Sequence, residues 1–174
     1  MHKPNYRIKP RPSKLLMYEE FYKDIKILKK QNYKNFSITD FACGESKLID
    51  VIKPSYYQGI DLKKKFIEAS KKKFNRNKCK FFTGNIINFN TKIKTKLGIC
   101  IQTLGINVNF EEDHLLQTLN NLNSHIFKNG SIIFNLSSEA YNNNKKKLMN
   151  FVLVTIRNLK LFTTDYLIKD IIIN

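Results

Sequence analysis

Cysteine, proline and glycine are all scarce in this chain of 174 residues. The three cysteines, Cys43, Cys79 and Cys100, are odd in number and lack CxxC spacing, which argues against a disulfide framework or a zinc site. Reduced thiols in a cytoplasmic protein are therefore the default expectation. The four prolines and six glycines form no linker, so a chain of this length is expected to hold one domain.

Long apolar runs are missing as well. No stretch approaches about 18 consecutive apolar residues, as a membrane span would require. The basic start of the chain has no apolar core like that of a secretory signal. Three of the four prolines lie in residues 1–13. We therefore expect an extended basic arm over residues 1–13 and a folded domain over residues 14–174.

Acidic residues are few, because 14 Asp and Glu stand against 31 Lys and Arg and give a formal charge of +17. Such an excess favours a polyanion partner such as RNA. Codon bias is the alternative, because the 27 Lys, 22 Ile and 21 Asn share A/T-rich codons. Arginine, the better residue for bidentate phosphate and base contacts, occurs only four times. Charge alone leaves both explanations open.

What the chain does contain is an alternation of strand and helix patterns. Short apolar runs typical of strands cover residues 37–42, 56–61, 79–83, 97–103 and 131–136, and one or two more fit within 159–173. Amphipathic patterns typical of helices cover residues 14–30, 45–53, 63–75, 111–127 and 143–158, with Asn129-Gly130 ending the fourth. This alternation predicts an α/β fold: a doubly wound, mostly parallel sheet with helices on both faces and an N-terminal helix.

Ligands of such sheets bind at the carboxyl ends of the strands, so the loops after the strands hold the candidate site. The first loop, Asp40–Ser46, contains a glycine turn that lets backbone amides approach a ligand closely. Asp61 ends the second strand pattern, where a carboxylate can accept hydrogen bonds from both hydroxyls of a ribose. Gly84-Asn85 follows the third strand pattern, and Gln102 lies near the end of the fourth.

This ordered set of loops resembles the class I (Rossmann-like) S-adenosylmethionine (SAM)-dependent methyltransferases over about residues 36–138. The family's first loop reads [DE]-x-[GA]-x-G-x-G, which this chain follows until Ser46 replaces the last glycine. The resemblance implies SAM as the cofactor and S-adenosylhomocysteine (SAH) as its product. It also implies a set of cofactor-binding residues: Asp40, Ala42, Cys43, Gly44, Asp61, Leu62, Asn85, Ile86 and Gln102.

The chain departs from the family pattern at two further positions. Asn85 stands where the family has an acid that contacts the adenine amino group, although an amide oxygen can accept the same hydrogen bond. The usual acid at the start of the fourth strand is missing, since Lys96 or Gly98 falls there. These departures motivate an alternative in which the chain is a non-catalytic, methyltransferase-like binding or partner subunit.

The reaction that the resemblance implies is in-line displacement at an activated methyl group, for which a protein supplies mainly proximity and alignment. His114, in the first turn of the predicted helix 111–127, is a candidate general base, and a surface or capping role is the alternative. For Cys43 the alternatives are backbone packing and a nucleophilic thiol. The residues after the fourth strand lack the N/D-P-P-Y/F motif of amino-methylating nucleic-acid enzymes. A small-molecule acceptor is therefore favoured, an RNA acceptor is the alternative, and neither a membrane partner nor a metal is expected.

Overall fold

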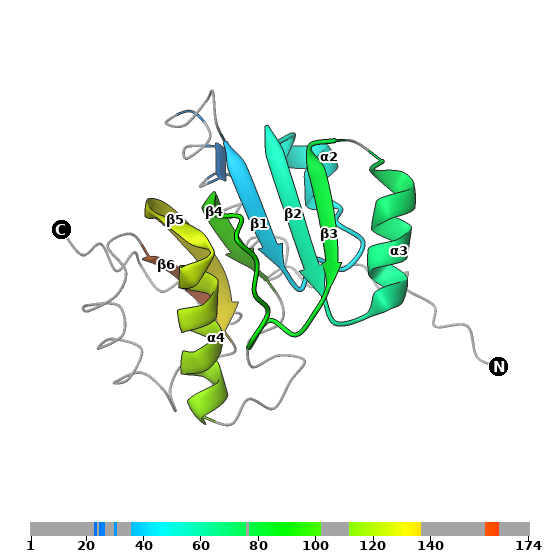
Figure 1. Ribbon diagram of the computed structural model, residues 1–174. Coiled ribbons are helices and arrows are strands. Elements are labelled where there is room, and N and C mark those ends of the chain that lie inside the picture. Colours follow the sequence, from blue (N-terminus) through cyan, green and yellow to red (C-terminus); the bar gives the residue numbers. More distant parts are fainter. Residues whose placement is uncertain are drawn as a thin grey trace.

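One sheet of six strands forms the centre of the computed structural model, which describes residues 23, 25, 26, 30, 36–75, 77–101, 112–136 and 159–163. The strands are β1 (Ser37–Phe41), β2 (Tyr56–Asp61), β3 (Cys79–Thr83), β4 (Thr95–Cys100), β5 (Ile126–Leu136) and β6 (Leu159–Thr163). Their order is β3-β2-β1-β4-β5-β6, and every neighbouring pair is parallel (Figure 1). The direction of winding reverses between β1 and β4, which confirms the predicted doubly wound sheet.

Helices cover both faces of this sheet, as predicted (Figure 1). The helices are α2 (Leu48–Ile52), α3 (Lys64–Lys73) and α4 (Glu112–Ser124). The connections β1–α2–β2 and β2–α3–β3 step one way across the sheet, while β4–α4–β5 steps the other way. Because such crossovers are right-handed, α2 and α3 lie on one face and α4 on the opposite face.

The beginning of the chain is described at only a few positions. Lys23, Ile25, Lys26 and Lys30 are helical, in agreement with the predicted helix 14–30, and Ile25 is buried in the core on the α2/α3 face. The rest of that helix, the arm 1–13 and the predicted helix 143–158 lie outside the described residues. No helix in the described part of the chain combines the length and hydropathy that crossing a bilayer requires.

The core consists of two clusters of buried side chains, one on each face of the sheet. Cys100 packs with Phe41 and Leu119 on the α4 face, whereas its neighbour Ile99 packs with Ile38 on the α2/α3 face. Successive side chains of a strand point to opposite faces. A central parallel strand buried on both faces therefore reads as a continuous apolar run.

An irregular connection takes the place of a helix between β3 and β4. Two side chains at the end of α4 hold it against the sheet. The amide nitrogen of Asn121 donates to the carbonyls of Ile86 (2.9 Å) and Phe89 (3.0 Å). The ring of His125 accepts the Thr91 N–H at Nε2 (3.2 Å), and its Nδ1 lies 2.7 Å from the Asn121 carbonyl. Since Nε2 is the acceptor, Nδ1 carries the proton and donates to that carbonyl.

The prediction that Asn129-Gly130 ends the fourth helix is wrong. Helix α4 ends at Ser124, β5 begins at Ile126, and Gly130 lies inside β5. The register explains the error, because Thr95 pairs with Ile126 whereas Leu97 pairs with Ser131, so β5 bulges against β4. Residues that serve in turns also serve in bulges, and the sequence alone does not separate the two uses.

The boundaries of α2 and β4 also differ from the prediction. Helix α2 begins at Leu48 instead of residue 45, because the left-handed backbone of Ser46 (φ 55°) is incompatible with a helix at that point. Strand β4 covers Thr95–Cys100 rather than 97–103, and residues 102 and 103 lie outside the described part. Strand β6 confirms one of the short strands expected within 159–173.

Candidate functional site

Asp61, at the carboxyl end of β2, holds three loops of the candidate site together. Its Oδ2 accepts the Gly44 N–H of the first loop (2.8 Å), and its Oδ1 accepts the Lys63 N–H just before α3 (2.8 Å). Its backbone carbonyl accepts the Gly84 N–H of the loop after β3 (3.0 Å). The side chain is 7% exposed. The structure therefore brings the loops after β1, β2 and β3 together around Asp61, where the sequence placed them.

The first loop turns through three left-handed residues. Ala42, Gly44 and Ser46 have φ angles of 62°, 54° and 55°, and these are the positions at which the resembling family's motif carries glycine or alanine. A left-handed residue with a side chain costs roughly 1–2 kcal/mol relative to glycine. The motif therefore needs glycine or alanine at these three positions because the backbone there is left-handed. The replacement of the last glycine by Ser46 keeps the shape of the loop at a cost in strain.

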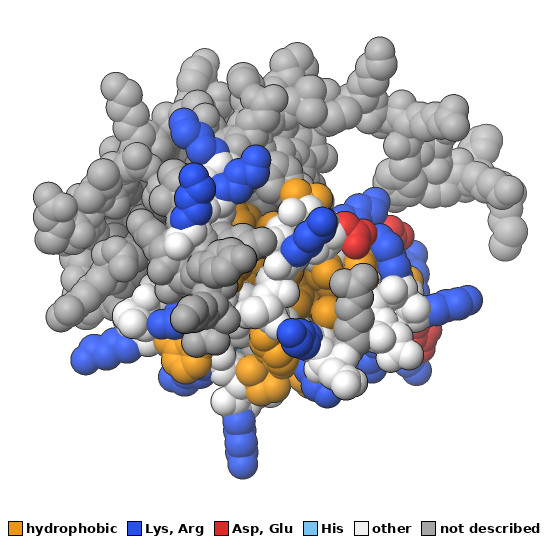
Figure 2. Space-filling view, turned by 90° about the horizontal axis from the view of Figure 1, so that it is seen from above, with side chains coloured by type: hydrophobic (Ala, Val, Ile, Leu, Met, Phe, Trp, Pro, Cys, Tyr) orange, Lys and Arg blue, Asp and Glu red, His pale blue; other side chains and the backbone are white. Residues whose placement is uncertain are grey.

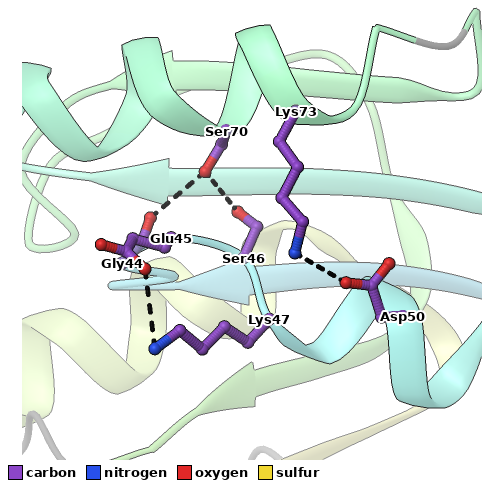
Figure 3. A network of polar contacts seen from close by, with 7 residues as sticks. All are labelled: Gly44, Glu45, Ser46, Lys47, Asp50, Ser70 and Lys73. Carbon is purple, nitrogen blue, oxygen red and sulfur yellow. Dashed lines mark hydrogen bonds and ion pairs between the residues drawn. The ribbon is translucent and has the colours of Figure 1, made fainter.

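Ser70 of α3 offsets part of that cost by anchoring the loop (Figure 3). Its hydroxyl donates to Ser46 Oγ (3.1 Å) and lies 3.4 Å from the Gly44 carbonyl. Both serines are buried. The same figure shows Lys73 of α3 reaching Asp50 of α2, with 2.7 Å between Nζ and Oδ2. Contacts from one face of α3 therefore hold both the loop and the short helix that follows it.

Asp40 is a buried residue near the end of β1, where the first loop begins. Its carboxyl group is 4% exposed, and its Oδ2 accepts a hydrogen bond from the Tyr57 hydroxyl (2.6 Å). The pKa of Asp40 is raised to about 7, mainly by burial; the Tyr57 hydrogen bond opposes the rise, and the charge of the nearby Asp61 adds to it. Asp40 therefore exchanges its proton near neutral pH.

We expect the raised pKa of Asp40 to make the free energy of unfolding fall as the pH rises from about 4 to about 7. The folded chain holds this proton more tightly than the unfolded chain, whose Asp pKa is about 3.9. The stabilisation is complete below that value and is lost as the pH rises through about 7. Urea unfolding at about pH 5 and about pH 8 should show a drop of roughly 2 kcal/mol that Asp40→Asn removes. An equal drop in the variant would contradict the assignment, and Asp50→Asn, an exposed carboxyl, is the control.

Cys43 is a packing residue in this loop. Its N–H donates to the Ile60 carbonyl (3.0 Å), and a Cβ added to Gly59 would lie 2.8 Å from its Sγ, so the thiol packs on that glycine. Burial, and then the charge of Asp40, raises the pKa of the Cys43 thiol far above its ordinary value. Because the thiolate is the reactive form, this thiol is held in its unreactive state, which favours the packing alternative.

The remaining candidate residues occupy different environments. Leu62 is 69% exposed beside Asp61. Asn85 is exposed and its Oδ1 accepts the Ile87 N–H (3.0 Å), as in a turn, whereas Ile86 points into the α4-face core, so only its backbone can face a ligand. His114 is half-buried in the first turn of α4, as predicted. Gln102 lies outside the described residues.

Sequence reasoning missed the side chains that position this site from other elements. Tyr57 on β2 holds Asp40, Ser70 on α3 holds the first loop, and Asn121 on α4 holds the loop after β3. Ser70 offered a signal, because it is a polar residue on the apolar stripe of its helix. Tyr57 and Asn121 offered none, since their partners are distant in the sequence.

Comparison with known proteins yields structural matches only. No protein-family model and no curated protein matches the chain. A SAM-dependent methyltransferase from Clostridium acetobutylicum is similar with a TM-score of 0.60 at 22% identity, over 74% of this chain and 54% of that one. The N-methyltransferase NodS from Bradyrhizobium japonicum, in complex with SAH, has a TM-score of 0.59 at 12% identity, over 76% and 66%. The sugar N-methyltransferase KedS8 from Streptoalloteichus has a TM-score of 0.52 at 14% identity, over 68% and 53%.

These matches concern the fold, because all the identities are low. This chain spans between about half and two thirds of the length of the three proteins, at 54%, 66% and 53%. The shared part includes the parallel sheet with strand order 3-2-1-4-5. The chain therefore has the Rossmann-like α/β fold of the class I SAM-dependent methyltransferases, as the loop pattern of the sequence predicted.

Proposed function

We propose that this chain binds SAM at the carboxyl edge of β1 and β2 and transfers its methyl group to a small-molecule acceptor. The observation that carries the proposal is the placement of Asp61. One carboxylate holds both the Gly44 and the Lys63 amides, and each of its oxygens keeps a lone pair for a further donor. A ribose offers two adjacent hydroxyl donors for such a group.

The residues around Asp61 fit the rest of such a ligand. A Cβ added to Gly44 would meet no atom within 4 Å, so the space above this backbone is open. Leu62, 69% exposed, offers an apolar surface on the other side of the carboxylate. The arrangement supplies open backbone, two hydrogen-bond acceptors and an apolar side chain within one short stretch. A nucleoside needs this combination, because its sugar is polar and its base is flat and apolar on its faces.

Bound SAM supplies a methyl group already activated by its sulfonium, so the chain needs only to align an acceptor in line with it and to exclude water. His114, in the first turn of α4, is the candidate for taking a proton from an acceptor that must lose one. The similar structures include a sugar N-methyltransferase and NodS, which supports a small-molecule acceptor over RNA.

Calorimetric titration with SAM and SAH, with ATP as the control nucleotide, tests the proposal. We expect micromolar binding of both SAM and SAH, which are sulfur-containing nucleosides, and none of ATP. Absence of heat at millimolar SAH would reject the proposal and favour the non-catalytic subunit. Asn85 gives that second candidate its own observation, because this exposed side chain is uncharged where the family has an acid, and the Ile87 N–H already uses part of its acceptor capacity.

Replacement of Gly44 by alanine separates ligand binding from folding. Because Gly44 has a left-handed φ of 54°, a side chain at this position lowers the stability of the protein by roughly 1 kcal/mol. The open surroundings add no steric clash. The methyl group would, however, stand where the ligand approaches. We expect Gly44→Ala to weaken SAH binding roughly tenfold or more, about 1.4 kcal/mol, with only a small loss of thermal stability. Unchanged affinity would place the ligand elsewhere.

A further inference from the structure

A second concave surface lies at the opposite edge of the sheet, where the strands begin. A hollow of about 420 Å³ is lined by Ser37, Ser55, Tyr56, Ile93, Lys94, Lys96 and Phe127. These residues stand at or just before the amino ends of β1, β2 and β4 and near that of β5. Strands of five or six residues at about 3.3 Å per residue separate the two edges by roughly 15–20 Å. The hollow is therefore distinct from the candidate cofactor site.

The charged groups of this hollow are all positive. Lys94 and Lys96 line it, and no acidic side chain does. In the part of the chain that the structure describes, the ion pairs involve Lys47, Lys64 and Lys73, and thus neither lysine of the hollow. Figure 2 looks onto this edge and shows lysine side chains projecting around exposed apolar surface. Such an unneutralised pair attracts an anionic ligand.

An aromatic ring lies beside these charges. Phe127 is 44% exposed, so part of its ring is open to solvent. The Lys96 ammonium sits 5.5 Å from the centre of the Phe127 ring and donates to Asn129 Oδ1 (3.0 Å). The ammonium lies over the ring, so a planar group would stack on the exposed part of Phe127 while Lys96 holds an anion attached to that group.

Hydrogen bonds of two serine side chains fix the lining of the hollow. Ser37 Oγ accepts the Lys96 N–H (3.0 Å), and Ser55 Oγ donates to the Phe36 carbonyl (2.8 Å). Tyr56 also lines the hollow, and its hydroxyl oxygen lies below the surface without a hydrogen-bond partner among the described residues.

We propose that this hollow, which we call the amino-end groove, binds single-stranded nucleic acid. Lys94 and Lys96 would contact phosphates, and Phe127 would stack a base. Lysine acts on phosphate as a point charge and does not read base edges as arginine does, so the binding is independent of sequence. The concave shape and the adjacent ring favour a chain of nucleotides over an anionic membrane, because a flat membrane surface would not enter the hollow.

Fluorescence anisotropy with a labelled single-stranded RNA of about 12 nucleotides, within the usual site sizes of such grooves, tests the proposal. At about 150 mM salt we expect Lys94→Gln/Lys96→Gln to weaken binding roughly tenfold or more. Its salt dependence should be shallower by roughly 0.7 log units per log unit of salt for each lost phosphate contact. Phe127→Ala should weaken binding roughly fivefold or more. The matched control is Lys71→Gln/Lys72→Gln, which removes the same charge from the exposed surface of α3.

Three results would contradict the proposal that the amino-end groove binds single-stranded nucleic acid. The control could weaken binding as much as the groove variant, which would show an effect of total charge. Polyglutamate or vesicles of anionic lipid could compete as well as RNA, which would assign the surface to another class of polyanion. Binding could also be undetectable at that salt concentration. Calorimetry of the groove variant with SAH runs in parallel, and its affinity should be unchanged, so that failure of the groove and failure of the cofactor site are distinguishable.

Discussion

Asp61→Asn is expected to weaken SAH binding roughly 30- to 100-fold while the protein remains folded. The variant removes the charge that two backbone N–H groups now share and turns one acceptor into an N–H₂ donor. Hydrogen bonds to charged groups contribute about 1.5–3 kcal/mol each, and the ribose contact and the loop geometry would be lost together. Calorimetry measures the loss of affinity, and a thermal melt shows that the sheet persists.

A matched substitution on α2 shows whether the loss of affinity depends on the position of Asp61 or only on the removal of one negative charge. Asp50 is half exposed and pairs with Lys73 across 2.7 Å, on the outside of the molecule. Asp50→Asn makes the same chemical change and should leave SAH affinity within about twofold, because an exposed ion pair contributes little. Equal affinity of Asp61→Asn and the unaltered protein would remove Asp61 from the site and with it the main support for the proposed function.

Gly130→Ala is expected to destabilise the fold by about 3 kcal/mol. A Cβ at this position would lie 2.6 Å from the Lys96 carbonyl oxygen and 2.4 Å from Ile126 Cγ2. A side chain can turn away from such a contact, but a backbone carbonyl of the neighbouring strand cannot without disturbing the pairing of β4 and β5. Overpacking of this kind costs typically 1–3 kcal/mol, and the backbone clash places this variant at the upper end.

Urea unfolding with Gly44→Ala as the comparison checks this expectation. Gly44 is required for its left-handed backbone and has open space around it, whereas Gly130 is required for space. The two alanine variants should therefore differ by roughly 2 kcal/mol. A Gly130 variant no less stable than the Gly44 variant would show that the bulge can shift to accept a side chain.

The parts of the fold that the sequence predicted are those set by local pattern. The fourth strand was recognised within residues 97–103 by its near-continuous apolar residues, because a strand buried on both faces is apolar along most of its length. The first loop and Asp61 were recognised because glycine spacing and a strand-terminal carboxylate are also local features. Their common location follows from the order of parallel strands. Their role in binding a cofactor remains a prediction.

What the sequence could not predict depends on pairing between distant segments. The bulge at Gly130 arises from the register of β5 against β4, and no pattern within β5 reveals it. The Tyr57–Asp40 hydrogen bond joins neighbouring strands whose register is known only from the sheet. Nothing in the sequence distinguished His125, yet it is 2% exposed.

The environment of His125 provides a natural spectroscopic reporter. Its ring stacks on Phe89 at 5.8 Å and meets the edge of Phe41 at 5.8 Å, in a chain that has no tryptophan and only three histidines. Aromatic ring currents displace the resonances of protons held against them. The carbon-bound imidazole protons of His125 should therefore appear away from those of His2 and His114 in a proton spectrum. Their return to ordinary positions during denaturation would follow the release of the irregular connection from the α4 face, without any label or added chromophore.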